Sequence, residues 1–412
     1  GNLRSYIMED VLEKALRYEG YNVNRVMNIT DVGHLSSDAD TGEDKMVKGA
    51  KREHKTVMEI AQYYTDAFFA DCKKLNIKRP DVVQPATGCI DEYIKIIAKL
   101  MDTGYAYFAG GNVYFDTSRL DHYYVFNDHD EDDLAVGVRE GVEEDTNKRN
   151  KNDFVLWFTK SKFENQALKW DSPWGIGYPG WHIECSEMSK KYLGEQIDIH
   201  AGGEDLIFPH HENEIAQSEA ANGKEFAKYW MHNGFLNIDN RKMSKSLGNF
   251  FTVREISEKY DLQVLRFFML SAHYRSPLNF SAELMEAAKN GLERITTAAE
   301  NLKFLINNAR TEDMSEDERK KLAGSIAYVE NFEKAMDDDF NTADAISAVF
   351  ELVKYMNTTT DGASSKEYLQ NLFDCLIRLT DVLGIIVDKE DEILASDIEA
   401  LIEERQAARK AK

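Results

Sequence analysis

The spacing of apolar residues changes along this chain, and that change constrains the fold more than any other feature. Near the start, apolar residues recur at helical spacing as far as Gly20. They are Leu3, Ile7, Val11 and Ala15. A short apolar segment, residues 23–29, follows directly and predicts a buried strand. A helix followed by a buried strand is typical of a parallel α/β unit, and such a unit would have its first strand before Gly1.

The C-terminal third has a different pattern, in which apolar residues follow long helical stripes. One stripe comprises Leu284, Ala288, Leu292, Ile295, Ala299, Leu302 and Ile306, and a second comprises Ile346, Val349, Phe350 and Val353. Such stripes predict a bundle of amphipathic helices.

The region between these two patterns, residues 80–165, combines short strand-like pieces with a very acidic segment. The strand-like pieces are residues 105–108 and 112–115, and the acidic segment is residues 128–145. We interpret this region as an insertion domain. A further acidic stretch that contains glycine, residues 36–49, predicts a surface loop.

Bulk properties indicate a multidomain globular protein of the cytosol. A length of 412 residues predicts two or three domains. The hydrophobic content of 43% is ordinary, and no apolar run approaches the roughly eighteen residues that a membrane span needs. The start of the chain has no basic flank and no apolar signal core. The cysteines are few, widely spaced and free of any C-x-x-C pair, which favours reduced thiols over a disulfide framework.

The net charge of -23 argues against a chain that binds nucleic acid over its whole surface. A large acidic enzyme can nevertheless carry a local basic track. Basic clusters occur at residues 242–245 and 405–412. The second cluster is also compatible with a solvated helix end.

One candidate metal site combines three ligand types: Cys185, His210 and Glu214. A thiolate, an imidazole and a carboxylate suit Zn²⁺ and suit Mg²⁺ or Ca²⁺ poorly. On a helix, two residues four apart such as His210 and Glu214 share one face. His182 and His211 are further candidates, and the sequence does not decide which imidazole turns inward. The alternative is a buried cysteine with His and Glu on a helix surface. Three ligands leave one position, which is either open for catalysis or filled from outside the chain.

A candidate phosphate-binding loop spans residues 241–249, with the sequence RKMSKSLGN. Its three cations, two hydroxyls and glycine can hold a triphosphate and stabilise charge on a leaving pyrophosphate. The chain has no G-x-x-x-x-G-K-[ST] motif, so it is not a P-loop enzyme. The alternative is an exposed basic loop. The glycines of residues 200–205 likewise either admit a ligand close to the backbone or mark a loop.

Several motifs together resemble one enzyme family. Residues 242–246 are identical to KMSKS, the second signature of class I aminoacyl-tRNA synthetases, and Gly1-Asn2 resembles the end of their first signature, H-x-G-N. Further stretches resemble cysteinyl-tRNA synthetases specifically: residues 28–31 (NITD), 179–186 (PGWHIECS), 208–214 (FPHHENE) and 338–345 (DDFNTADA). These matches occur in order and with consistent spacing over nearly the whole chain.

The resemblance implies a fold and an activity. The implied fold is α/β, with a Rossmann-like parallel-sheet catalytic domain, an insertion domain and an α-helical bundle. The implied enzyme is a cytoplasmic monomer that uses ATP, with Mg²⁺, to convert L-cysteine to cysteinyl-adenylate. It then transfers the cysteinyl group to the 3′ end of tRNA(Cys). The boundaries we expect are 1–80 and 166–250 for the catalytic domain, 81–165 for the insertion, 251–300 for a linking helical region, 301–395 for a tRNA-binding bundle and 396–412 for the start of an anticodon-recognition module.

The resemblance also implies residue roles. Zinc ligands would be Cys185, His210 and Glu214. The cysteine pocket would contain Thr30, Trp181, His200 and Asp205. ATP would be bound by Gly1, Asn2, Lys242, Ser244, Lys245 and Ser246, with Lys242 and Lys245 as the catalytic cations. Because Zn²⁺ prefers thiolate over hydroxyl, the metal would select cysteine over serine without editing.

Both ends of the chain depart from the family pattern. The His that opens the first signature, and the Cys that supplies a fourth zinc ligand, do not precede Gly1. The sequence stops at Lys412, within what resembles the start of the anticodon-recognition module. We therefore expect a chain truncated at both ends, with weakened zinc retention and reduced adenylation.

Two alternative functions remain open from the sequence. A related ligase that joins activated cysteine to an amino sugar would share the catalytic half. The match at residues 338–345 and the basic residues near Lys412 favour tRNA as the acceptor. The missing His would also allow a non-catalytic remnant that binds tRNA, and such a remnant would show no cysteine-dependent ATP turnover.

Overall fold

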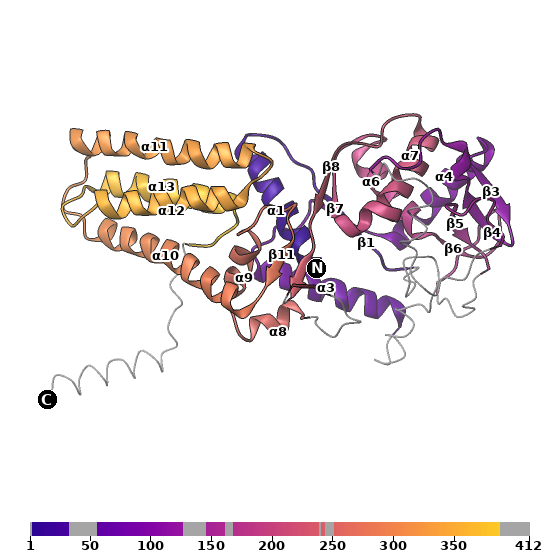
Figure 1. The fold of residues 1–412 in the computed structure, drawn as a ribbon, viewed down its shortest axis with the longest axis horizontal. Helices are drawn as coiled ribbons and strands as arrows, with labels where there is room; N and C mark the ends of the chain where they lie inside the picture. Colours follow the sequence, from indigo (N-terminus) through magenta and orange to yellow (C-terminus); the bar gives the residue numbers. More distant parts are fainter. Residues whose placement is uncertain are drawn as a thin grey trace. The chain divides into compact units, whose positions relative to one another are not determined.

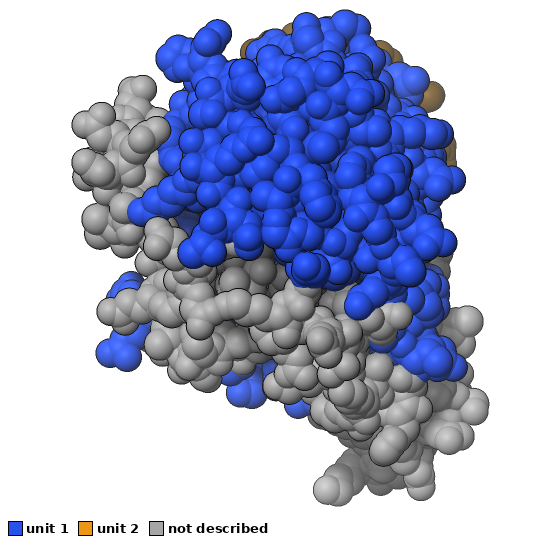
Figure 2. All heavy atoms as spheres, turned by 90° about the vertical axis from the view of Figure 1, so that its right-hand side faces the viewer, with its two compact units in different colours: residues 1–281 blue, residues 282–412 orange. Residues whose placement is uncertain are grey.

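The structure is a computed structural model that describes residues 2–32, 56–126, 146–160, 168–238, 240–243 and 251–387. The chain divides into two compact units, residues 1–281 and 282–412 (Figure 2). The acidic stretch predicted as a loop at 36–49, the acidic segment 128–145 and the proposed module 396–412 lie outside the described residues.

Unit 1 begins with the parallel α/β unit that the sequence predicts. Helix α1 (Leu3–Tyr18) buries Ile7, Val11 and Ala15. Strand β1 (Val26–Ile29) pairs in parallel with β2 (Val82–Pro85), and α3 (Val57–Lys74) lies between them in the chain. A parallel pair with a helix in its connection is a βαβ unit, and the α/β class is confirmed.

The strand β1 is shorter than the predicted segment 23–29, and its residues are half-buried and not buried as predicted. The carbonyl of Val23 accepts a hydrogen bond from Arg17 at 2.6 Å, and the N–H of Arg25 donates to Asp81 at 3.0 Å. These backbone groups bond to side chains, and strand pairing begins at Val26.

A second parallel pair carries most of the candidate site. Helix α6 (Trp181–Leu193) precedes β7 (Ile197–Gly203), which pairs in parallel with β8 (Ala227–Asn233). Between these strands the chain forms η3 (Glu204–Leu206), η4 (Ile207–His211) and α7 (Glu212–Asn222). Helix α6 contacts β1, β7 and α7, so the residues on these elements can meet.

An antiparallel sheet has three strands within the region 81–165 that was predicted as an insertion, and its fourth strand lies beyond that region. Its strand order is β3 (Ala106–Ala109), β4 (Asn112–Phe115), β5 (Phe154–Phe158) and β6 (Tyr178–Pro179). The turn between β3 and β4 consists of Gly110 and Gly111, whose φ values of +58° and +97° favour glycine. Helix α4 (Ile90–Asp102) contributes buried residues to the core beneath this sheet, as does Trp157 of β5. Short turns η1 (Ala86–Cys89) and η2 (Thr117–Arg119) connect these elements.

The last part of unit 1 flanks the predicted phosphate loop on both sides in the chain. Strand β9 (Leu236–Ile238) pairs antiparallel with β10 (Arg241–Lys242) and parallel with β11 (Leu278–Phe280). Helices α8 (Val253–Ser257) and α9 (Leu262–Met269) lie between β10 and β11 in the chain. Arg266 of α9 is fully buried and donates to Asp10 of α1 at 2.6 Å, which ties these elements to the start of the chain.

The described helices of unit 2 form the predicted bundle. They are α10 (Ala282–Asn307), α11 (Glu316–Asp337), α12 (Thr342–Thr359) and α13 (Lys366–Val382), drawn from orange to yellow in Figure 1. The first predicted stripe is buried from Ala288 to Leu302, but Leu284 is exposed, because Met285 and not Leu284 fills the buried position in the first turn of α10. The described part of the chain contains no helix with the length and apolarity needed to cross a membrane.

Candidate active site and metal centre

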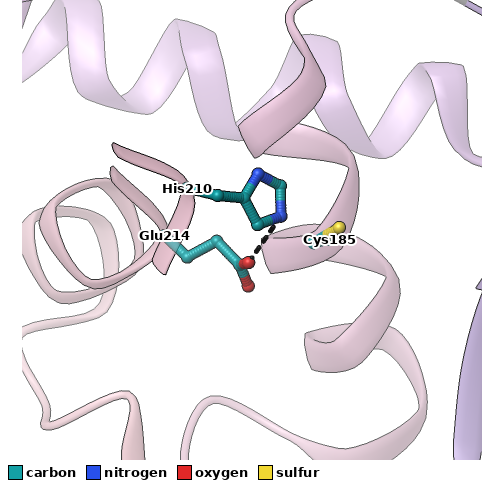
Figure 3. A group of neighbouring side chains, drawn as sticks. All are labelled: Cys185, His210 and Glu214. Carbon is teal, nitrogen blue, oxygen red and sulfur yellow. Dashed lines mark ion pairs between the residues drawn. The ribbon is translucent and has the colours of Figure 1, made fainter. Parts of the chain in front are cut away.

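The three candidate metal ligands converge from different elements of unit 1. Cys185 lies on α6, His210 in η4 and Glu214 on α7. One ligand atom from each lies within 4.8 Å of the others, and Figure 3 shows the side chains directed toward one another. Nε2 of His210 is 2.8 Å from Oε1 of Glu214. The two residues therefore share one face, as their four-residue spacing predicts.

The local backbone explains why His210 reaches this position. Phe208 has extended backbone angles (φ -125°, ψ 132°), and the peptide bond between Phe208 and Pro209 is cis. The turn η4 then runs directly into α7. His210 and His211 thus stand buried at the start of that helix.

The structure distinguishes between the histidines that the sequence left open. His210 meets Cys185 and Glu214, whereas His211 belongs to a second group of potential ligands with His200 and Glu214. His182 lies beside His210, with 2.8 Å between their Nδ1 atoms. Burial lowers the pKa of His182 well below its usual range, so its ring is neutral. Because Nδ1 of His210 meets His182, its Nε2 is the ring nitrogen that faces the ligand group.

The ligand group fits a zinc ion. Oε1 of Glu214 is buried, and among the described residues it has no partner aligned for a hydrogen bond, although Nε2 of His210 is 2.8 Å away. A cation placed between Cys185, His210 and Glu214 would satisfy this oxygen. Burial raises the pKa of the Cys185 thiol well above its usual range, so metal binding must displace a proton from it.

Glu214 is held as a carboxylate by two imidazoles. Burial alone would raise its pKa, but His200 and His210 hold the pKa of Glu214 well below its usual range. Nε2 of His200, on β7, lies 2.8 Å from the second carboxylate oxygen. A histidine that orients a ligating carboxylate is a common second contact around protein metals.

Three of the four residues predicted for the cysteine pocket adjoin this group. Thr30 accepts a hydrogen bond from Asn28 at 3.4 Å, and the same amide nitrogen lies 3.5 Å from the sulfur of Cys185. The ring of Trp181 lies 4.1 Å from that of His210, and His200 contacts Glu214 directly. Asp205 is exposed in η3, and no hydrogen bond between described residues connects it to the group.

Strand β8 adds residues that the sequence interpretation missed. Trp230 and His232 alternate along β8, opposite His200 and Gly202 of β7. The ring of Trp230 lies 4.7 Å from that of His200, and Nε2 of His232 lies 2.8 Å from Nδ1 of His211. Burial lowers the pKa of His211 to about 2 and that of His232 to about 4, so both are neutral. The alternation of aromatic residues at positions 230 and 232 was the available signal.

The residues predicted to bind ATP are only partly described. Asn2 is exposed just before α1. The backbone of Lys242 pairs with Asn237 in the β10–β9 hairpin. Gly1, Ser244, Lys245 and Ser246 lie outside the described residues, as does the side chain of Lys242.

Comparison with known proteins decides the family. Residues 1–290 match the model of the tRNA synthetases class I (C) catalytic domain, and residues 331–387 match the DALR domain. A cysteine–tRNA ligase of Lachnospira eligens is 53% identical over 421 residues, covering 100% of this chain and 86% of the relative. The chain belongs to the cysteine–tRNA ligase family. A second member, from Clostridioides difficile, is 49% identical over 412 residues and is covered to 85% of its length. The resemblance seen in the sequence is confirmed.

Solved structures confirm the class I fold. A methionyl-tRNA synthetase of Mycobacterium tuberculosis in complex with methionyl-adenylate superposes with a TM-score of 0.61 at 16% identity, covering 93% of this chain and 86% of that one. A putative arginyl-tRNA synthetase of Campylobacter jejuni gives 0.57 at 13% identity, with 93% and 89% covered. At these identities the likeness concerns the fold alone, a Rossmann-like catalytic domain followed by helices.

Proposed function

We propose that this chain activates L-cysteine with ATP and transfers the cysteinyl group to the 3′ end of tRNA(Cys). The observation that carries this proposal is the convergence of Cys185, His210 and Glu214 within 4.8 Å. The relatives that match the chain over its whole length are named cysteine–tRNA ligases, which supports the same reaction.

Cys185, His210 and Glu214 would hold a zinc ion. When bound, zinc supplies a Lewis acid that prefers a thiolate sulfur to a hydroxyl, and so separates cysteine from serine. The chain's own residues prepare this site. His200 orients the carboxylate of Glu214, and the ring of Trp181 packs against His210 and limits how far that ring can turn. A site ordered in this way discriminates between two amino acids that differ by one atom.

The basic loop would act on ATP, supplied with Mg²⁺. The carboxylate of cysteine attacks the α-phosphate and pyrophosphate leaves, which forms cysteinyl-adenylate. A ribose hydroxyl of the tRNA then attacks the cysteinyl carbonyl, and AMP leaves as the ester bond to the tRNA forms. Lys242 and Lys245 would stabilise the charge that develops on the phosphates, with Ser244 and Ser246 as further contacts. Gly1 and Asn2 would border the nucleoside. No covalent enzyme intermediate is needed, so catalysis rests on positioning and on cations.

We assign the remaining parts of the chain within this scheme. Residues 81–165, which contain β3 to β5, are proposed as an insertion in the catalytic domain, and residues 301–395 as a tRNA-binding bundle. The enzyme is proposed to work as a monomer in the cytoplasm.

A charging assay tests the proposal. The full chain, loaded with zinc, is incubated with ATP, radiolabelled cysteine and a tRNA(Cys) transcript, with an amino sugar as the competing acceptor. We expect labelled tRNA and no labelled sugar. Labelled sugar would instead identify a cysteine ligase for a small acceptor. Binding of tRNA without consumption of ATP would identify a non-catalytic remnant.

A further inference from the structure

Residues 233–235, which are the last residue of β8 and the two residues that join it to β9, are held by hydrogen bonds with side chains in distant parts of unit 1. Nη1 of Arg4 donates to the carbonyl of Gly234 at 2.9 Å, and its Nη2 donates to the carbonyl of His273 at 3.0 Å. On the other side of the same peptide, the N–H of Phe235 donates to Oε1 of Glu204 at 3.1 Å. The peptide between Gly234 and Phe235 is thus bonded at its carbonyl by a cation and at its N–H by an anion.

Further contacts leave this tripeptide little freedom. Oγ of Ser5 donates to Oδ1 of Asn233 at 2.6 Å, and the N–H of Gly234 donates to the carbonyl of Tyr274 at 2.9 Å. A Cβ added to Gly234 would lie 2.7 Å from the carbonyl oxygen of Arg275. The backbone of the neighbouring segment therefore approaches as closely as a glycine allows.

These hydrogen bonds matter because residues 233–235 connect two strands that lead to different parts of the proposed active site. Strand β8, before it, pairs with β7, which carries His200 of the proposed cysteine pocket and ends at Gly203 beside Glu204. Strand β9, after it, pairs with β10, where Lys242 begins the KMSKS motif. The N–H of Met243 also donates to the carbonyl of Leu236 at 3.2 Å. A shift of residues 233–235 would therefore displace the backbone of Lys242 relative to the proposed cysteine pocket.

The burial of Arg4 and the opposite charges of Arg4 and Glu204 suit residues that hold a backbone segment in one position. Arg4 is only 2% exposed. Burial lowers the pKa of Arg4 to about 10, and the nearby Glu204 opposes this shift, so Arg4 stays charged at neutral pH. Its planar guanidinium donates from two nitrogens in a rigid fork to carbonyls on two separate segments, whereas a lysine would offer a single nitrogen on a flexible stem.

We propose that Arg4 and Glu204 are positioning residues that fix residues 233–235 and so set the distance between the cysteine pocket and Lys242. This inference rests on the proposed function. Among the described contacts, neither residue bonds to the candidate metal ligands Cys185, His210 and Glu214. The effect of Arg4 and Glu204 falls on the alignment of cysteine with ATP, where a displacement of about 1 Å can cost roughly 100-fold in rate.

The test uses the full chain with the variants Arg4→Lys and Glu204→Ala, and Arg17→Lys as a control. Arg17 lies on the same helix and makes side-chain contacts to Glu13 and Val23 away from the site. Three quantities are measured: cysteine-dependent exchange between ATP and pyrophosphate, zinc content, and hydrogen exchange of peptides that cover residues 233–243.

We expect Arg4→Lys and Glu204→Ala each to lower kcat of the exchange by about 10- to 100-fold while the KM for cysteine and the zinc content stay unchanged. Amides of residues 233–243 should exchange at least about tenfold faster, and those of α6 and α7 at the wild-type rate. The double variant should lose little more than the worse single variant, because both act on one peptide.

Two results would overturn the inference. One is wild-type kcat together with wild-type hydrogen exchange in both variants. The other is faster hydrogen exchange over all of unit 1, which would show that Arg4 and Glu204 stabilise the whole unit and not residues 233–235 in particular. If the wild-type chain showed no cysteine-dependent exchange between ATP and pyrophosphate, the proposed function would fail. Hydrogen exchange of residues 233–243 in the variants would still decide whether Arg4 and Glu204 hold this segment.

Discussion

Replacing Glu214 by Gln should weaken zinc binding strongly while keeping the volume of the side chain. The carboxylate is fully buried and lies 2.8 Å from the Nε2 atoms of both His200 and His210. Glutamine keeps the volume but removes the negative charge, and it places an amide N–H₂ against one of two imidazole nitrogens. Loss of an outer contact to a metal ligand costs 10- to 100-fold in affinity, and here an anionic ligand is lost as well. We therefore expect the zinc dissociation constant to rise at least 100-fold, or about 2.7 kcal/mol.

The assay for this change is competition for zinc with a chromophoric chelator. Glu219→Gln serves as the matched control, because Glu219 lies on the same helix and accepts from the N–H of Phe226, away from the ligand group. Circular dichroism verifies that both variants are folded. A folded Glu214→Gln protein that binds zinc as tightly as the control would refute the assignment of Glu214 as a ligand.

Three further predictions concern stability. Asp10→Asn leaves the buried charge of Arg266 without its carboxylate and should cost about 3–5 kcal/mol in urea unfolding; a loss under about 1 kcal/mol would contradict this. In Gly177→Ala, the new Cβ would lie 1.9 Å from a carbonyl oxygen of β5, so the thermal midpoint should fall by an amount equivalent to about 2 kcal/mol or more. Gly362→Ala, which meets nothing within 4 Å, should change it little. Burial alone would raise the pKa of Glu318, but hydrogen bonds from two serines lower it from 4.5 to about 2. Its carboxylate therefore stabilises unit 2 above pH 4.5, and this stability is lost as the pH falls toward 2. Glu318→Gln should lower stability at pH 7 and flatten the acid dependence, whereas an unchanged acid transition would disprove the assignment.

The elements of this fold were predictable where the signal is local. The helical stripe from Leu284 to Ile306 predicts α10, because a helix buries residues three or four apart whatever its neighbours are. The strand at 23–29 was predicted too long, since the contacts that end it come from Arg17 and from Asp81, which is more than fifty residues away. Local apolarity does not reveal such competition for backbone groups.

The site was predictable as a set of residue types but not as an arrangement. The spacing of His210 and Glu214 places them on one face, yet the choice among His182, His210 and His211 depends on the backbone turn at residues 207–211. The hydrogen bond from Arg4 to the carbonyl of Gly234 joins residues 230 positions apart. No local pattern signals a hydrogen bond across that separation, so only the fold reveals it.

Cysteine-dependent exchange between ATP and pyrophosphate, measured on the full chain with zinc supplied and serine as the competing substrate, tests the central claim most directly. The account predicts exchange with cysteine and none with serine, and loss of cysteine exchange after the zinc is removed by a chelator. Exchange that proceeds equally with serine, or that persists without zinc, would contradict the assignment of Cys185, His210 and Glu214 as the centre that selects cysteine.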